Sequence, residues 1–515
     1  MSSAESRFDA AAAAQQMLDL ETRAPQATLP AQQNAAVHPV QEQQVPLGCL
    51  LPSMLTDRGN AKLFASLYGD RFRHVEGLGW YTWDTYRWKR TGGEKAALWA
   101  AGDMAEQMSA SDPTGLFTER ELAAHRKRAM STQGIKAMLT QAKASPALAL
   151  DPDVLDGDAY ALCTPGGVIN LHTGELRKPD PVRDLHSRAT TVAPEAMPTP
   201  RWHRFLTDTF GDDAKGAETI TFLQLLLGYS ITGDVGAQVL PFLYGTGANG
   251  KSVLLDVMTQ IIGDYAQAAP PGFLMEKGNY SEHSTELTEL HGRRIVVCSE
   301  LKPNDKFDEA RVKLLTGGDR ITARRMRQDF FSFNPTHKLW LLGNHRPEVG
   351  TGGHAFWRRI RLIPFERVVP TERKIDNLAG ELVHSEGPGI LHWLIEGAQR
   401  YLATRDPLTG PATVRTATEA YATTEDHIGR FLTEACTTTP RNDGSDLRVE
   451  QGLLFATYTA WCSSEGIRPA TVRAFATRVR QELNLASPSE MMKSSGKKYY
   501  PGLGLVSDDP APAGD

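Results

Sequence analysis

A glycine-rich run between an apolar segment and a helical pattern limits the folds open to this chain more than any other stretch. It reads Tyr-Gly-Thr-Gly-Ala-Asn-Gly-Lys-Ser and occupies residues 244–252. The apolar segment 239–244 ahead of it predicts a buried strand, and apolar residues after it have helical spacing, at 253, 254, 257, 258, 261 and 262. Strand, loop and helix therefore follow in the order of a phosphate-binding loop.

The residue types in this run suit a bound nucleoside triphosphate. Glycines let backbone amides close around phosphate oxygens, and the following helix presents its positive dipole end. Lysine adds a point charge, and the serine hydroxyl is a magnesium ligand. We expect ATP and Mg²⁺ as cofactors, held by Gly245, Thr246, Gly247, Ala248, Asn249, Gly250, Lys251 and Ser252. The alternative is a glycine-rich turn before an ordinary helix.

Bulk composition is that of an ordinary soluble protein. The chain has 515 residues, 41% hydrophobic and 23% charged, which is room for two to four domains. Its net charge of -5 gives no overall positive field, so a DNA-binding surface needs local clusters. Five scattered cysteines without a C-x-x-C pair argue against a disulfide framework or a thiolate zinc site. Without a long apolar stretch, we expect no membrane association and a cytoplasmic location.

Composition shifts divide the chain into four predicted parts. Residues 1–48 are rich in Ala, Gln and Pro and are expected to be a disordered arm. An α+β domain is predicted over 49–195, an α/β NTPase domain with a helical extension from 371 over 196–425, and a small helical domain over 426–510.

Within the second part, the aromatic run 80–88 predicts a hairpin that turns at Asp84 and Thr85. Its rings either pack on the domain, which we favour, or stack on bases. Helices are expected at 94–109 and 118–144. The acidic cluster 151–158 contains Pro and Gly and is interpreted as a turn.

Two later predicted strands end in polar residues that suit an NTPase. The strand 294–299 delivers Glu300, which we expect to polarise the attacking water and to face the metal. Because Ser299 occupies the preceding position, the metal would be held chiefly through Ser252. The strand 338–343 ends in Asn344, which could contact the terminal phosphate or position the water. An ordinary surface glutamate and an ordinary turn asparagine are the alternatives.

A basic stretch lies between those two strands. Residues 311–346 contain eight Lys or Arg against two Asp, a local excess of +6. A hairpin here could track a phosphate backbone, with an affinity that falls with salt. The candidate DNA-binding residues are Lys313, Arg324, Arg325 and Arg327. A solvated charged face is the alternative.

Two arginines precede the last predicted strand of this domain. Arg358 and Arg359 stand directly ahead of the apolar segment 360–365. An arginine so placed can project into the nucleotide site of a neighbouring subunit, which implies a ring, and spacing does not choose between the two. The alternative is that both pair with surface carboxylates.

The C-terminal part carries two further basic segments. Residues 471–480 predict a helix with an arginine-bearing face, and 496–502 a basic turn between strands. Together they suggest a winged helix-turn-helix, with Arg473, Arg478, Lys497 and Lys498 toward DNA. A protein-contact role is the alternative.

Taken in their order along the chain, these motifs resemble those of the superfamily 3 helicases, in particular the phage and plasmid primase-helicases related to the poxvirus primase-helicase. The loop 245–252, Glu300, the segment 317–327, Asn344 and the stretch 358–365 stand in the family's order. The resemblance extends upstream to the hairpin 80–88 and to 166–171.

The resemblance implies a P-loop, AAA+-like α/β core, followed by a winged-helix domain. It also implies an ATP-dependent, homo-hexameric helicase of phage or mobile-element DNA replication that translocates on single-stranded DNA in the bacterial host cytoplasm. A replicative primase or polymerase is a candidate further partner. The alternative function is an ATP-switched replication initiator or DNA-binding regulator without processive unwinding.

This sequence departs from the family pattern in three places. The acidic pair of the second motif is reduced to Ser299 and Glu300, and the hairpin tip reads Arg327-Gln328-Asp329. Relatives that prime DNA carry a polymerase-type domain with paired metal-binding carboxylates, often with a zinc module. Neither pattern is found in the sequence, so we expect this chain not to prime.

Overall fold

The computed structural model describes residues 50–276, 284–299, 301–324, 330–350, 352–438, 447–485 and 487–506. All of them belong to one unit, Leu47–Asp515. The predicted arm 1–48 lies outside the described residues, as do Glu300, Arg325 and Arg327.

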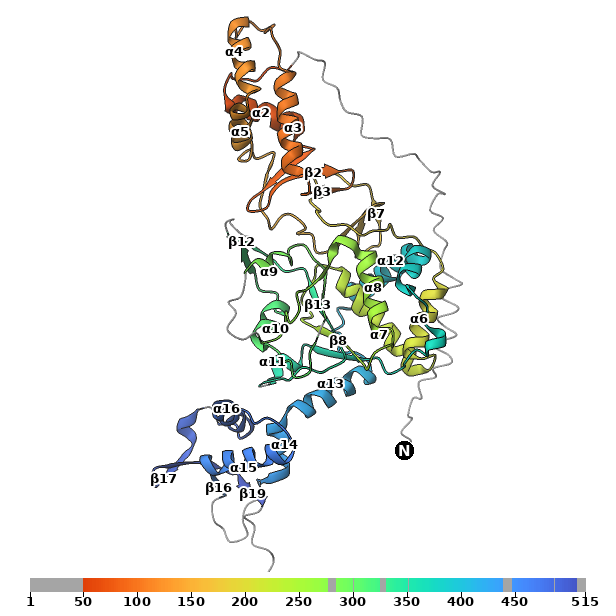
Figure 1. The fold of residues 1–515 in the computed structure, drawn as a ribbon, viewed down its shortest axis with the longest axis vertical. Helices are drawn as coiled ribbons and strands as arrows, with labels where there is room; N and C mark the ends of the chain where they lie inside the picture. Colours follow the sequence, from red (N-terminus) through yellow and green to blue (C-terminus); the bar gives the residue numbers. More distant parts are fainter. Residues whose placement is uncertain are drawn as a thin grey trace, which may run out of the picture. The chain divides into compact units, whose positions relative to one another are not determined.

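The N-terminal elements form a four-stranded sheet beside four helices (Figure 1). The sheet order is β3-β2-β1-β4, built from β1 Phe72–Val75, β2 Gly79–Asp84, β3 Arg87–Lys89 and β4 Ala149–Leu150. The helices are α2 Asp57–Tyr68, α3 Gly93–Glu106, α4 Glu119–Ala129 and α5 Thr132–Ala142. The single helix predicted over 118–144 is therefore two helices. It breaks because the Ser131 side chain caps α5 by accepting a hydrogen bond from the Gly134 amide.

The aromatic run is a packed hairpin, as favoured from the sequence. β2 and β3 pair antiparallel with Asp84 opposite Arg87, so the turn is made by Thr85 and Tyr86, one residue later than the predicted turn at Asp84 and Thr85. Trp80 and Trp88 are 2% and 0% exposed. Rings buried to this extent serve the core and are not available for base stacking.

A small sheet and an ordered turn connect these elements to the next. The sheet order is β5-β6-β7, from β5 Ala161–Thr164, β6 Gly167–Asn170 and β7 Leu176–Arg177. The acidic cluster before it is a turn, as predicted, and its buried Asp156 accepts hydrogen bonds from the amides of Ser187 (2.7 Å) and Arg188 (3.2 Å). This carboxylate therefore holds the backbone at Ser187 and Arg188 in place.

A five-stranded parallel sheet forms the centre of the molecule. Its order is β14-β8-β13-β10-β9, and every pairing in it is parallel. The strands are β8 Leu240–Tyr244, β9 Ala266–Ala268, β10 Ile295–Cys298, β13 Lys338–Gly343 and β14 Ile360–Pro364. β8 and its two neighbours are almost wholly buried, which explains their continuous apolar sequence. The chain is thus a mixed α/β protein with a parallel sheet.

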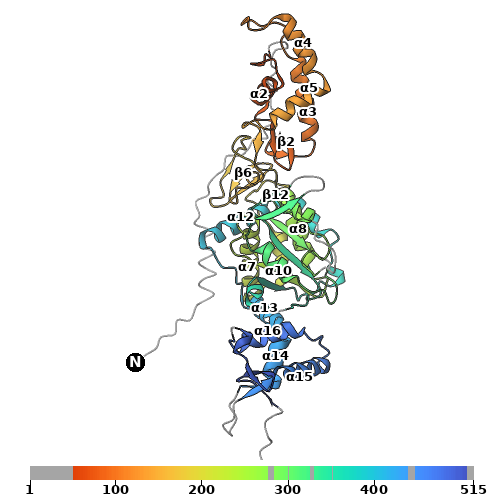
Figure 2. The same cartoon turned by 90° about the vertical axis from the view of Figure 1, so that its left-hand side faces the viewer.

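Helices cover this sheet and extend beyond it. α7 Ala214–Ile231, α8 Lys251–Ile262 and α12 Leu378–Thr404 lie together in both views and share one hydrophobic core (Figures 1 and 2). α6 Pro200–Phe210 joins them, with the Glu386 carboxylate of α12 accepting hydrogen bonds from its first amides, Arg201 and Trp202. The extension predicted from 371 is helical and consists of α12 and α13 Ala412–Glu425.

A short hairpin interrupts the chain between β10 and β13. It consists of β11 Ile321–Arg324 and β12 Phe330–Phe333, paired antiparallel, and we call it the basic hairpin. α9 Ser284–Thr288 and α10 Glu309–Thr316 precede it, and α11 His354–Trp357 stands before β14. Short 3₁₀ turns complete the chain at Gly263–Tyr265, Thr371–Arg373 and Pro488–Glu490.

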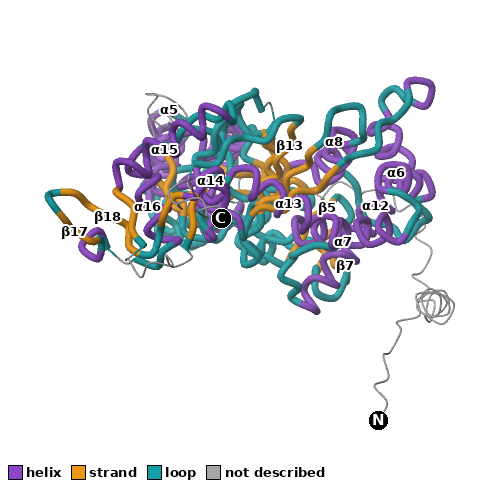
Figure 3. The backbone as a smooth tube through the Cα atoms, turned by 90° about the horizontal axis from the view of Figure 1, so that it is seen from below, coloured by secondary structure: helices purple, strands orange, loops and turns teal. Residues whose placement is uncertain are grey.

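The C-terminal elements are three helices and two small sheets (Figure 3). The helices are α14 His427–Ala435, α15 Gln451–Ser464 and α16 Val472–Glu482. The sheets are β16-β18-β17 and β15-β19, from β15 Cys436–Thr437, β16 Arg448–Glu450, β17 Met492–Ser494, β18 Lys497–Pro501 and β19 Gly504–Leu505. Phe431, Tyr458 and Phe475 lie at the centre of their own hydrophobic core.

Candidate functional site

The glycine-rich run forms a loop between β8 and α8. α8 begins at Lys251, and Gly250 in front of it has a left-handed φ of +87°. A Cβ there would approach Thr209 Oγ1 to 3.0 Å and the Phe205 ring to 3.2 Å, so α6 backs the loop closely. A side chain at Gly245 would meet the Asn249 amide nitrogen at 2.3 Å. Only glycine fits at these two positions.

Lys251 is held inside the loop by the loop itself. Its Nζ donates to the Gly245 carbonyl and to Asn249 Oδ1, both at 2.8 Å, and the residue is 4% exposed. Asn249 is fixed in turn, because its Nδ2 donates to the Phe365 carbonyl at 2.7 Å. Burial lowers the pKa of Lys251. Both acceptors of this buried ammonium among the described residues are neutral, and an anion would stabilise it, so these residues fit a bound phosphate group.

The exposed side of the loop presents hydroxyl groups. Thr246 and Ser252 are both exposed. A metal ion there would need further oxygen ligands, and the predicted one, Glu300, lies outside the described residues, two positions after the end of β10 at Cys298. In the ranges that the structure describes, no group of three or more His, Cys, Asp or Glu side chains could hold a metal ion. The assignment of Ser252 and Glu300 as magnesium ligands therefore stays a prediction.

The sheet register brings Asn344 to the loop. Gly343, the last residue of β13, lies opposite Tyr244, the last residue of β8, so exposed Asn344 follows beside Gly245. Cys298 of β10 lies opposite Leu341 of the same strand β13. The chain positions after β8, β10 and β13 thus share one edge of the sheet, which we call the loop edge.

Arg346 is a residue at the loop edge that the sequence reasoning did not assign to this site. Its guanidinium lies 4.5 Å from the centre of the Tyr244 ring and is exposed. An arginine stacked on an aromatic face keeps its charge and its donors. The available signal was its place two residues after Asn344, at the end of a strand already assigned to the site.

Arg358 and Arg359 lie at the opposite edge of the sheet. Ile360 at the start of β14 pairs with Leu240 at the start of β8, so the arginines stand at the far end of β8 from the loop, roughly 13 Å along the strand at 3.3 Å per residue. We call this end the arginine edge. Neither side chain approaches the loop of its own chain.

The two arginines differ in burial. Arg359 is 6% exposed and donates to Thr316 Oγ1 at 2.9 Å, to the Ala355 carbonyl and to Gln238 Oε1 at 3.4 Å. Burial, with a smaller contribution from Arg358, lowers the pKa of Arg359. Arg358 is exposed and donates to Gln238 Oε1 at 2.5 Å. Arg359 is therefore packed into the fold, whereas Arg358 faces solvent.

Four of the six described cations of the basic stretch form ion pairs or hydrogen bonds inside the chain. Arg311 pairs with Glu286 at 3.2 Å and Lys313 with Glu309 at 3.3 Å. Arg320 pairs with Asp153. Lys338 is fully buried and donates to the Thr232 and Thr336 carbonyls, and burial lowers its pKa well below the ordinary value. The excess of +6 counted from the sequence therefore overstates the open positive surface.

The basic hairpin keeps an exposed cation and an exposed ring. Arg324 lies with its guanidinium 5.1 Å from the ring centre of Phe330, which is 62% exposed. Phe331 and Phe333 are buried. One face of the hairpin is thus anchored in the core, and the other presents a guanidinium on an aromatic ring.

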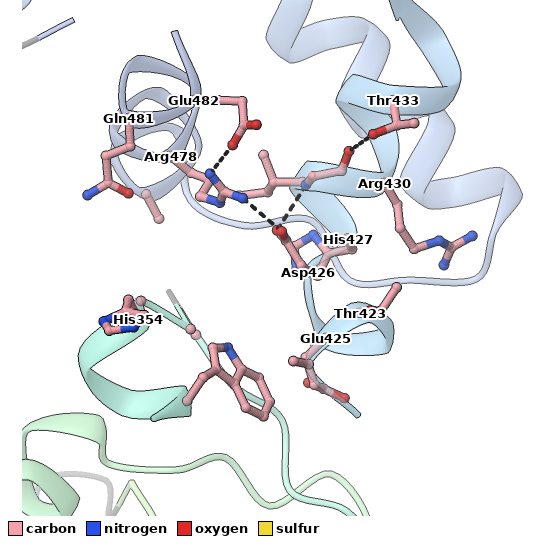
Figure 4. Close-up of a pocket in the computed structure, with 18 of the residues that line it drawn as sticks. His354, Thr423, Glu425, Asp426, His427, Arg430, Thr433, Arg478, Gln481 and Glu482 are labelled. Atoms are coloured by element: carbon pink, nitrogen blue, oxygen red, sulfur yellow. Dashed lines mark hydrogen bonds and ion pairs between the residues drawn. The ribbon is translucent and has the colours of Figure 1, made fainter. Parts of the chain in front are cut away.

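The DNA-binding candidates of the C-terminal part also divide into residues with carboxylate partners and residues at the surface. Arg478 of α16 pairs with Asp426 at 2.8 Å and with Glu482 at 2.5 Å, as Figure 4 shows. Burial opposes the charge, but these hydrogen bonds raise the pKa of Arg478 above its ordinary value. These side chains line a hollow of about 830 Å³ between the 350–357 segment, α13, α14 and α16. Arg478 therefore fixes α16 to the start of α14.

The remaining C-terminal candidates lie at the surface. Arg473 is exposed on α16. Lys497 pairs with Glu450 at 2.7 Å, whereas Lys498 is exposed and lies opposite Lys493 across the β17–β18 hairpin. Like charges in a cross-strand pair destabilise a hairpin unless an anion lies nearby.

Two family models match the chain. One, described as D5 N terminal like, matches residues 61–211, and a family of unknown function, DUF5906, matches residues 243–359. The second match begins one residue before Tyr244 and ends at Arg359. It therefore includes both edges of the central sheet.

Viral proteins are similar to parts of the chain. The provisionally named helicase L207/L206 of Acanthamoeba polyphaga mimivirus is 33% identical over 145 residues, 28% of this chain and 15% of that protein. Helicase 184R of Invertebrate iridescent virus 6, also named provisionally, is 32% identical over 25% of this chain and 14% of that protein. The provisionally named primase C962R of African swine fever virus is 21% identical over 56% of this chain and 32% of that protein.

A solved structure, the C-terminal region of NrS-1 in its apo A form, aligns with a TM-score of 0.40 at 13% identity, covering 61% of this chain and 80% of that one. The chain spans at most a third of the curated relatives described here. By fold it is a mixed α/β protein with a parallel sheet. Over these matched segments, the chain is similar to viral proteins provisionally named helicases and primases. No helix in the described ranges is long and apolar enough to cross a bilayer.

Proposed function

We propose that this chain is an ATP-dependent DNA helicase of phage or mobile-element replication, with a P-loop core of the AAA+ type and a C-terminal winged-helix domain. It would act as a ring, with ATP at the contact between subunits. The observation that carries the proposal is the separation of the loop edge from the arginine edge. Groups suited to one phosphoryl transfer lie at opposite ends of β8, so one chain supplies half of the site.

Each residue has a defined task in this proposal. The loop amides and Lys251 would hold the phosphates, and Ser252 with Glu300 would hold magnesium, which neutralises charge on the phosphate oxygens. Glu300 would orient the water, and Asn344 would contact the terminal phosphate. Arg358, the exposed member of the pair, would reach the neighbour's phosphate, whereas Arg359 would hold the local fold.

Among the described candidates, DNA contact would involve the exposed groups. Arg324 and Phe330, with Arg325 and Arg327, would meet single-stranded DNA in the channel, and Arg473 and Lys498 would meet DNA from the C-terminal domain. Lys313, Arg478 and Lys497 have carboxylate partners and are weaker candidates. A replicative primase or polymerase would be a separate partner.

The direct test compares the purified protein with Lys251→Ala in ATPase and fork-unwinding assays. Removing one preorganised charge from a phosphate site lowers kcat on the order of 10²–10³-fold, and we expect a loss of at least this size in both assays. Equal activity in the two preparations would refute the proposal. ATPase activity without any unwinding would favour the ATP-switched initiator instead.

A further inference from the structure

Gln238 connects the arginine edge to the basic hairpin. It lies in the turn between α7 and β8 and is half-buried. Its Oε1 accepts hydrogen bonds from Arg358 Nη2 at 2.5 Å and Arg359 Nη2 at 3.4 Å, and its Nε2 donates to the Gly317 carbonyl at 2.7 Å. Gly317 caps α10 and begins the Gly-Gly-Asp segment that leads into β11. One side-chain amide thus touches both functional elements.

The backbone of Gln238 is held in an uncommon conformation. Its φ is +52°, in the left-handed region that residues other than Gly, Asn and Asp seldom adopt. Its amide closes the turn by donating to the Val235 carbonyl at 3.1 Å. The surrounding fold therefore imposes this conformation, and with it the direction of the side chain.

The two arginines depend on Gln238 to different degrees. Arg359 also donates to Thr316 and Ala355, so it stays in place without Gln238. For Arg358, Gln238 is the side-chain acceptor within the described ranges. A phosphate oxygen is a stronger acceptor for a guanidinium than a neutral amide is. A triphosphate on the neighbouring subunit would therefore take Arg358 away from Gln238.

We propose that Gln238 is a positioning residue through which the nucleotide state of one subunit reaches the basic hairpin of the next. While Arg358 is bound to it, the amide oxygen is shared by two cations and the amide nitrogen holds Gly317. When Arg358 leaves for a phosphate, the amide is free to follow Arg359, and its hold on Gly317 changes. The position of Gly317, just ahead of the basic hairpin, thereby depends on whether the neighbouring subunit carries ATP. This inference rests on the proposed function.

The test measures how strongly single-stranded DNA stimulates ATP hydrolysis, in addition to the activity itself. Gln238→Asn keeps a residue that tolerates a left-handed φ but is too short to bridge, and Gln238→Glu keeps the acceptor for the arginines but loses the donor to Gly317. The control is Gln141→Ala, at an exposed position of α5. For each protein, kcat is measured with and without a single-stranded oligonucleotide, together with the oligonucleotide Kd and the thermal midpoint.

We expect DNA stimulation of kcat to fall about tenfold in both Gln238 variants, within the range usual for coupling between sites, while the oligonucleotide Kd changes little. The Gln141 control keeps full stimulation. If Gln238→Asn fails to fold, Gln238→Glu, which fills the same space, decides alone.

Three outcomes contradict the coupling role. Stimulation at the wild-type level in Gln238→Asn would exclude a role for the side chain, and stimulation retained in Gln238→Glu would exclude the link to Gly317. A wild-type protein that DNA does not stimulate would overturn the proposed function itself and this inference with it. The failure of the inference alone is thus distinguishable from the failure of the function.

Discussion

The loop edge and the arginine edge of the central sheet are built on different principles. At the loop edge, backbone and small side chains enclose one buried ammonium, and the polar residues around it face solvent. At the arginine edge, a buried guanidinium and an amide tie α10, α11 and the start of β8 together, and one guanidinium projects outward. In the proposed function, the first edge would receive a phosphate group and the second would supply an arginine to it from another copy of the chain.

The proposed difference between the two edges is tested most directly at Arg358. Arg358→Ala should lower kcat on the order of 10³-fold with little change in ATP affinity, because an arginine supplied to a neighbour acts on the transition state. The measurement is steady-state ATPase with nucleotide binding by fluorescence. Mixing Arg358→Ala with Lys251→Ala should restore part of the activity, since some contacts then combine an intact loop with an intact arginine. Absence of any recovery in the mixture would argue that Arg358 acts within its own chain.

Phe330 lies on the basic hairpin, which follows Gly317, the residue that Gln238 links to the arginine edge. Phe330→Ala should weaken single-stranded DNA binding by about 1–3 kcal/mol, the usual value of one base stacked on an aromatic ring. Fluorescence anisotropy at two salt concentrations measures this. Because Phe330 is 62% exposed, the thermal midpoint should stay close to the wild-type value. Phe331→Ala, at a buried position of the same hairpin, is the contrasting variant, and a larger effect on DNA than on folding there would contradict the assignment of faces.

Arg359 gives the smallest expected effect on catalysis and the clearest effect on folding. Arg359→Ala leaves Thr316 Oγ1 and the Ala355 carbonyl without their charged donor, so the free energy of unfolding should fall by about 1.5–3 kcal/mol. Urea unfolding followed by circular dichroism tests this, with exposed Arg358→Ala as the matched control. If Arg358→Ala destabilised the chain as much as Arg359→Ala, the distinction between the two arginines would be lost.

The order of elements and the nature of the loop could be predicted from the sequence. Apolar strands at 239–244, 294–299 and 338–343 correspond to β8, β10 and β13, because a buried parallel strand is apolar along its whole length. The hairpin at 80–88 followed from its aromatic pattern. The break between α4 and α5 was missed, since Ser131 and Thr132 sit in an otherwise continuous helical pattern and only the capping bond at Gly134 shows the restart.

Charge was the least predictable property. Counting Lys and Arg over 311–346 gives a positive surface, yet Arg311, Arg320 and Lys338 find carboxylates or carbonyls far away in the chain. Arg478 does the same with Asp426. The partner of a long cationic side chain is set by packing between distant segments, and local sequence does not contain that information.

The candidate phosphate-binding residues could thus be predicted from the sequence, because the glycines and the lysine of that loop are adjacent along the chain. Tertiary structure alone decided that Arg359 is buried while adjacent Arg358 is exposed, that both stand at the far end of β8 from the loop, and that Gln238 joins them to Gly317. Sheet register and side-chain burial are properties of the assembled fold. They arise from contacts between distant segments, such as the contact between Gln238 and Arg358, which are 120 positions apart.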